Sequence, residues 1–89
     1  MESQIKWEVG KYGGVGGSGI GVSGTIGLTP HKFTQSPVVV CQIMRTNHDA
    51  FNARHVYVYT SNVTNDYFQY TVKGDRKPGD QICWIAIGS

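Results

Sequence analysis

Near its C-terminus the chain reads Ile82-Cys83-Trp84-Ile85-Ala86-Ile87-Gly88, a run in which the even-numbered and the odd-numbered positions are both apolar. In a strand, successive side chains point to opposite faces of the sheet, so this run presents an apolar surface on each side. Such a strand lies between two apolar layers, either a facing sheet or a second subunit. Because 89 residues build one small core rather than two, we expect another copy of the chain to cover the second face.

The rest of the chain has the pattern of short strands separated by turns. Apolar alternation and β-rich composition predict strands at 4–9, around 19–28, and at 38–44, 55–60 and 67–73. No window of useful length has helical periodicity. We therefore expect residues 1–89 to form a single all-β domain, a small antiparallel β-sandwich of about six strands.

These strands differ in the faces that they present. In the first, Ile5, Trp7 and Val9 are expected to face the core and the intervening polar side chains to face solvent. The run 38–44 is apolar on both faces, which makes it the natural neighbour of the C-terminal strand. Turn chemistry between 61 and 66 predicts a hairpin of the strands on either side of it.

A glycine-rich segment spans residues 10–27, interrupted by Val15, Ile20, Val22 and Ile26, so it is not a plain flexible linker. Its second half is the strand predicted around 19–28, with glycines alternating on the face opposite the apolar residues, where a large ring or another backbone comes close. The sequence Gly14-Val15-Gly16-Gly17-Ser18-Gly19 fits the pattern of a dinucleotide-binding loop, but no helix follows, which favours a close-packed or flexible glycine loop. We expect Tyr12, Val15, Ile20 and Val22 to pack against a neighbouring subunit or a larger assembly.

Composition and charge restrict the classes of function. Charged residues are 16% of the chain, below the roughly 25% of ordinary domains, and the net charge of +2 is scattered apart from a small cluster at 73–77. Without a basic stripe, we expect no nucleic-acid partner. No apolar run approaches the ~18 residues that span a bilayer, so we expect no membrane insertion. Residues 1–4 lack the layout of a signal peptide, so we expect the chain not to export itself.

The chain offers no catalytic constellation, and we expect no enzyme, no metal and no cofactor. Cys41 and Cys83 lie in apolar strands and are interpreted as buried free thiols, with a disulfide as the alternative if their strands are neighbours. The adjacent His48-Asp49 is interpreted as part of a solvated turn. A metal bound by His31, His48 or His55 would need ligands from symmetry-related subunits.

The second half of the chain resembles a known family. It contains Ser36-Pro37-Val38-Val39-Val40, a polar loop, a Val/Tyr-rich strand, Asn62-Val63-Thr64 with Phe68 shortly after, and Trp84-Ile85-Ala86-Ile87-Gly88. Over about residues 26–88 this order resembles the H-type lectin domain. The resemblance implies a six-stranded antiparallel sandwich that forms parallel trimers and binds N-acetylgalactosamine or related sugars.

The resemblance also implies where a sugar would bind. The family uses an Arg near the start of the strand after the polar loop, aromatic or His residues in the turn before the last strand, and a neighbouring subunit's N-terminal loop. Here Arg54 or His55 occupies the Arg region, and the turn 73–80 offers Asp75 and Arg76 but no aromatic residue. The predicted ligand-binding residues are Arg54, His55, Tyr57, Asp75 and Arg76.

Two functions follow from this interpretation. The first is a non-enzymatic, trimeric carbohydrate-binding module for attachment to host or cell-surface glycans. The alternative is a virion structural protein, a phage tail fibre, spike or capsid decoration subunit, that uses the lectin-like fold for assembly without binding sugar. The exposed face of His55, Tyr57 and Tyr59 is interpreted either as a ligand-stacking surface or as a subunit contact. The expected location is a virion or an extracellular-facing site, with a cytoplasmic stage before assembly.

Overall fold

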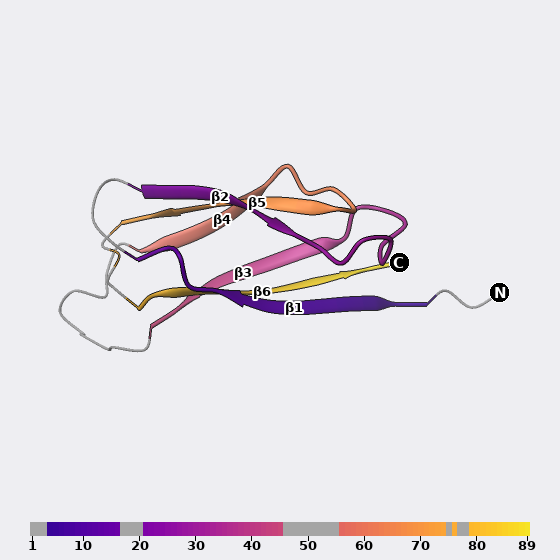
Figure 1. Ribbon diagram of the computed structural model, residues 1–89, viewed down its shortest axis with the longest axis horizontal. Helices are drawn as coiled ribbons and strands as arrows, with labels where there is room; N and C mark the ends of the chain where they lie inside the picture. The colour runs from indigo at the N-terminus through magenta and orange to yellow at the C-terminus, as the bar shows by residue number, and fades with distance from the viewer. Residues whose placement is uncertain (1–3, 17–20, 46–55, 75, 77–78) are drawn as a thin grey trace.

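Each of the two sheets is organised around a central strand (Figure 1). In sheet A the central strand is β6 (Gln81–Gly88), which pairs with β1 (Lys6–Tyr12) and β3 (Val38–Met44). In sheet B it is β5 (Tyr67–Lys73), which pairs with β2 (Gly21–Gly27) and β4 (Tyr57–Ser61). The alternating β pattern and the turn residues between these segments account for all of these elements.

This computed structural model describes residues 4–16, 21–45, 56–74, 76 and 79–89. In this part of the chain, six strands form two three-stranded sheets, and every strand pair is antiparallel. Figure 1 shows the sheets as two layers, with β2, β5 and β4 above β3, β6 and β1. The expected all-β, β-sandwich-like architecture of about six strands is confirmed. No helix among the described residues has the length and apolar character needed to cross a membrane.

The core lies between the two central strands. Ile82, Trp84 and Ala86 face inward from β6, as Phe68, Tyr70 and Val72 do from β5, and all six are buried. The rings of Phe68 and Trp84 meet edge to face, with their centroids 5.3 Å apart. The residues that share a face on β5 and on β6 are therefore those predicted from the sequence. The predicted pairing of β3 with β6 and of β4 with β5 is also confirmed.

The glycines of β1 and β2 make room for the two largest core rings. Gly10 pairs with Trp84 and Gly24 with Tyr70, and a Cβ atom at either glycine would meet the paired ring. A large ring does lie against Gly24, but on the same inward face as Val22 and Ile26, not on the opposite face where the glycines of this strand were expected.

The prediction of which face of β1 meets the core is wrong. Trp7 and Val9 point away from the core and are 62% and 63% exposed. The register explains this, because Gly10 pairs with the inward-facing Trp84 and Glu8 with the inward-facing Ala86. The half-buried Lys6 and Glu8 contact the backbone of the loop after β2 instead, through Lys6 Nζ to the Lys32 carbonyl and the Thr29 amide to the Glu8 carboxylate.

The loop between β2 and β3 covers one end of the core. Leu28 and Phe33 are buried there against the cluster that contains Phe68 and Trp84. The Thr34 backbone amide and hydroxyl both donate to the Ser89 carbonyl, at 2.8 and 3.0 Å, so this loop is joined to the C-terminal residue. The two prolines of the loop lie outside the strands, as expected for residues that lack a backbone donor.

The glycine-rich segment packs on its own chain at the residues that the structure describes. Val15 is fully buried in the core cluster of Tyr70, Val72 and Ile82, and Val22 packs against the same cluster. The Tyr12 ring lies 5.7 Å from that of Tyr70. The expectation that Val15 packs against a neighbouring subunit is therefore wrong. For Tyr12, which is 43% exposed, and the partly buried Val22 it stays a prediction, and Ile20 lies outside the described residues.

Candidate functional site

The outer face of sheet A is apolar across all three strands. In register order its first row is Trp7-Ile87-Val38 and its second row is Val9-Ile85-Val40. Ile5 extends this face at one end, and Lys11, Cys83 and Gln42 form a more polar row at the other. We call the first two rows together with Ile5 the apolar face.

The apolar face is accessible in the single chain. Val38 is 68% exposed and Ile5 is 76% exposed, in addition to Trp7 and Val9. It also carries two hollows. One of about 400 Å³ is bordered by Ile5, Val38 and Ile87, and one of about 220 Å³ is bordered by Val40, Cys83 and Ile85. Such a face has the composition of a contact surface rather than of a solvated sheet.

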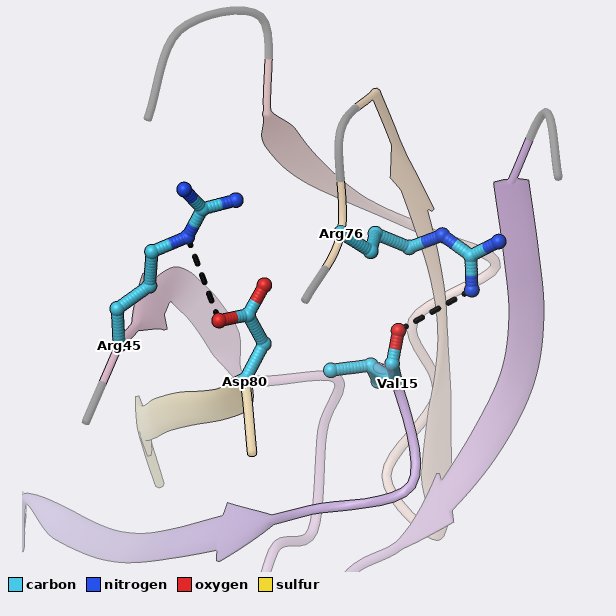
Figure 2. Close-up of polar contacts among 4 residues, drawn as sticks. All are labelled: Val15, Arg45, Arg76 and Asp80. Carbon is cyan, nitrogen blue, oxygen red and sulfur yellow. Dashed lines mark hydrogen bonds and ion pairs between the residues drawn. The ribbon is translucent and has the colours of Figure 1, made fainter. Parts of the chain in front are cut away.

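The end of the sandwich where the sugar site is predicted contains buried charges. Asp80, immediately before β6, is 2% exposed, and its Oδ1 lies 3.3 Å from Nε of Arg45, immediately after β3 (Figure 2). The antiparallel register pairs Met44 with Gln81, which brings Arg45 and Asp80 side by side. A buried carboxylate requires such pairing, because removing it from water is costly.

Arg76 is one of the predicted ligand-binding residues, and the structure places it inside the molecule. It is buried, and its Nη1 donates to the Val15 carbonyl at 3.2 Å. Figure 2 shows the Arg76 guanidinium directed toward Val15 from the turn that follows β5. Its side chain therefore joins this turn to the glycine-rich segment.

The other predicted ligand-binding residues have different positions. Tyr57 is 53% exposed and pairs with Lys73, so it lies near the start of the turn that carries Arg76. Arg54, His55 and Asp75 lie outside the described residues, as do His48 and Asp49. Sequence reasoning missed the Arg45–Asp80 pair, although an Arg directly after one apolar strand and an Asp directly before its predicted neighbour were a usable signal.

Sheet B has an outer face of another kind. Because Val56 and Val58 pack against the core, Tyr57 and Tyr59 point outward from β4, and about half of each side chain is exposed. Their rings are nearly parallel, with an interplanar angle of 22° and centroids 6.5 Å apart. The strands beside them carry Thr71, Gln69, Ser23 and Thr25, and a hollow of about 270 Å³ lies over these residues. This face is polar and aromatic, in contrast to the outer face of sheet A.

The cysteines are free, as interpreted, but both are only partly buried, so the interpretation of them as buried thiols is wrong in this respect. Cys41 pairs with the inward-facing Trp84 and packs against the core, while Cys83 pairs with Gln42 and points to the outer face of sheet A. The two cysteines lie on neighbouring strands, one register position apart. Their side chains point to opposite faces of sheet A, which prevents a disulfide bond. Burial raises the pKa of the Cys41 thiol to about 11. Among the described residues, no group of three or more His, Cys, Asp or Glu side chains has an arrangement that holds a metal ion.

The turn 61–66 uses its side chains locally. The Thr64 hydroxyl accepts the Asp66 and Tyr67 amides, each at 3.1 Å, and Asn62 donates its side-chain amide to Gln69 Oε1. The side chains of Asn62 and Thr64 therefore stabilise the turn itself.

Comparisons of the chain with protein-family models, with curated proteins and with solved structures find no match.

Proposed function

We propose that this chain is a non-enzymatic carbohydrate-binding module that works as a homotrimer, with the apolar face of sheet A as the subunit contact. The observation that carries the proposal is that face, where two complete rows of apolar side chains across three strands are accessible in the single chain.

The size of the apolar face supports a stable contact. The exposed fractions of its residues correspond to on the order of 600 Å² of apolar surface, at the upper end of the largest patch on an ordinary monomer. A standard interface buries about 800 Å² per partner, which the apolar face and a rim around it would supply. Its two rows contain no charged or polar side chain, and the third row carries the cation Lys11 at its edge.

A second copy of the chain is the occupant that this surface fits best. Two pleated sheet faces of the same kind pack at about 10 Å with their side chains interdigitated, which needs a flat apolar partner such as sheet A itself. The hollow beside Ile87 and Val38 and the exposed Trp7 lie on this same face, so a neighbouring copy would bring apolar side chains to both. The resemblance of residues 26–88 to the H-type lectin domain favours three copies around one axis over two.

Carbohydrate binding is the function that such a trimer would serve. With sheet A at the axis, sheet B of each subunit points away from it, so three equivalent polar surfaces are presented. Multivalent presentation multiplies weak single-site affinities by roughly 10²–10⁴, which suits attachment to glycans on a host or cell surface. In this proposal the partners are other copies of the chain and a glycan, and the place of action is a virion or another extracellular-facing site.

One observation favours a second candidate, a virion structural subunit that assembles through the same face without binding sugar. Arg76, a residue predicted for the sugar site, is buried and bonded to the Val15 carbonyl, so its guanidinium serves the fold. A fibre, spike or capsid decoration subunit needs the trimer but no ligand site.

Light scattering coupled to size exclusion tests the assembly. At micromolar concentration we expect the mass of three chains for the wild type and of one chain for Val9→Asp, which places a charge in the second row of the apolar face. Thr25→Asp, on the exposed outer face of sheet B, is the matched control and should remain trimeric. Because Val9 is exposed in the single chain, circular dichroism should report a folded Val9→Asp monomer. A wild-type monomer would overturn the proposal, and a trimer that binds nothing on a glycan array would leave the structural candidate.

A further inference from the structure

We infer that the outer face of sheet B binds a neutral oligosaccharide, with Tyr59 and Tyr57 packing against sugar rings and the neighbouring hydroxyl and amide groups bonding to sugar hydroxyls. This inference rests on the proposed function and gives it a site. The site lies on the face of the sheet, away from the end of the sandwich that contains Arg45, Arg76 and Asp80.

The register brings the aromatic and polar groups into adjacent rows. Tyr59 pairs with Thr71, which pairs with Ser23, and the next row is Ser61-Gln69-Thr25. Thus one exposed ring and five short polar side chains form a continuous patch over three strands. The hollow of about 270 Å³ lies over the five polar side chains, and Tyr59 adjoins it through its pairing with Thr71. Its volume is slightly below the ~300 Å³ of the smallest drug-sized pockets, which suits one or two sugar rings.

The tyrosines supply an apolar surface that the fold does not use. Tyr59 is 46% exposed, and its ring lies nearly parallel to that of Tyr57. The C–H face of a pyranose ring packs on an aromatic ring, and a tyrosine adds a hydroxyl at its rim for hydrogen bonding. The 6.5 Å between the two ring centroids allows adjacent sugar units to contact both.

The polar groups beside the rings are held in place by bonds to each other. Ser23 Oγ and Thr71 Oγ1 are 3.0 Å apart across the strands, and each hydroxyl retains capacity for a further hydrogen bond. Asn62 donates to Gln69 Oε1, which leaves the Gln69 Nε2 group to donate to a ligand oxygen. Prearranged donors and acceptors of this kind reduce the entropy lost on binding.

The charge of the face indicates the class of sugar. Among the described residues on the outward positions of β2, β4 and β5, Lys73 is the single charged side chain, and it lies at the end of its strand. Neutral hydroxyl, amide and phenol groups match the hydroxyls of a neutral sugar. A sialylated or sulfated glycan would gain little from a surface with one cation at its margin.

A glycan array carrying neutral galactose-, N-acetylgalactosamine- and glucose-terminated oligosaccharides, together with sialylated ones, tests the inference on the intact wild-type protein. We expect neutral glycans to bind, Tyr59→Ala to lower binding at least tenfold, and Tyr59→Phe to retain most of it. Tyr67→Ala is the control, because Tyr67 is an exposed tyrosine on β5 that pairs with Gly27, two rows away from the row of Tyr59 and Thr71. Light scattering and thermal melting verify that each variant is folded and assembled as the wild type is.

Chemical shifts of the wild type provide a readout that needs no variant. Titration with the neutral oligosaccharide that binds best on the array should perturb the amides of 23–25 and 69–71. Binding that survives Tyr59→Ala but disappears with Arg54→Ala or His55→Ala would overturn this inference while the proposed function stands. Selective binding of sialylated glycans would overturn the neutral class. An assembled trimer that binds no glycan would overturn both the inference and the carbohydrate function.

Discussion

Gly10 lies directly opposite Trp84 in the register of β1 and β6, and a Cβ atom at Gly10 would come within 2.6 Å of the indole ring. The absence of a side chain at this position lets the largest core ring lie flat against the backbone of β1. Sheet A can therefore bury Trp84 between its own edge strand and sheet B.

Gly10→Ala should lower the free energy of unfolding by about 1–3 kcal/mol, because the added methyl group displaces a packed ring. Gly27→Ala is the control, since a Cβ at Gly27 meets nothing within 4 Å. It should be neutral or stabilise by up to about 1 kcal/mol through the unfolded chain. Urea denaturation of both variants measures the difference, and equal stabilities would contradict the packing of Trp84 on Gly10.

Asp80→Ala should destabilise the protein by about 3 kcal/mol, because it leaves the Arg45 guanidinium without its carboxylate in a largely buried place. Asp66→Ala removes an exposed carboxylate and should change stability by no more than about 0.5 kcal/mol. The double variant Arg45→Met/Asp80→Leu should recover part of the loss, since it replaces both members of the ion pair by apolar side chains. A double variant that is less stable than Asp80→Ala would disprove the pairing argument.

Arg76→Ala should weaken the attachment of the glycine-rich segment, because it removes the donor to the Val15 carbonyl. We expect a loss of about 1–3 kcal/mol, the cost of leaving a buried polar group unsatisfied. Hydrogen exchange should be faster at amides 13–16 than in the wild type. Lys73→Ala, which removes an exposed cation of the same region, should leave both quantities near the wild-type values.

The two thiols should react differently. Cys41 packs against the core, and burial raises the pKa of its thiol to about 11, so little thiolate forms near neutral pH. Cys83 points to the outer face of sheet A. Maleimide labelling of a Val9→Asp monomer at pH 8, followed by mass spectrometry, should modify Cys83 first. In the assembled wild type Cys83 should be protected as well, and equal labelling of Cys83 in both states would count against the contact through sheet A.

Stability should decrease at alkaline pH. Burial raises the pKa of the Cys41 thiol from 9.0 to about 11, and burial followed by the hydrogen bond with Tyr12 raises that of Tyr70 from 10.0 to about 12. Below pH 9 both groups are protonated in the folded and the unfolded chain, and their stabilising contribution is complete. Above that pH the unfolded chain loses protons first, so the free energy of unfolding falls from pH 9 toward 11. Melting temperatures across this range check it, and Cys41→Ala should flatten the decrease between pH 9 and 10.

Much of the architecture follows from local pattern. Period-2 alternation placed Phe68, Tyr70 and Val72 on one face of β5 and separated Ile82, Trp84 and Ala86 from Cys83, Ile85 and Ile87 on β6, and the structure confirms both assignments. Apolar content at both parities also predicted that β3 and β6 are neighbours. These features depend only on the geometry of a strand, in which each side chain's face is fixed by its position relative to the next.

The sequence alone determined which residues form strands and which faces of most strands are apolar, because strand geometry is a local property. It left undetermined which side of β1 meets the core: alternation assigned Trp7 and Val9 to the interior, but pairing Gly10 with Trp84 and Glu8 with Ala86 turns them outward. Likewise the burial of Val15, its bond to Arg76 and the side chains around Tyr59 depend on contacts between residues far apart in the chain. Register and the stacking of two sheets set these contacts, and a shift of one residue in register exchanges the faces of a whole strand.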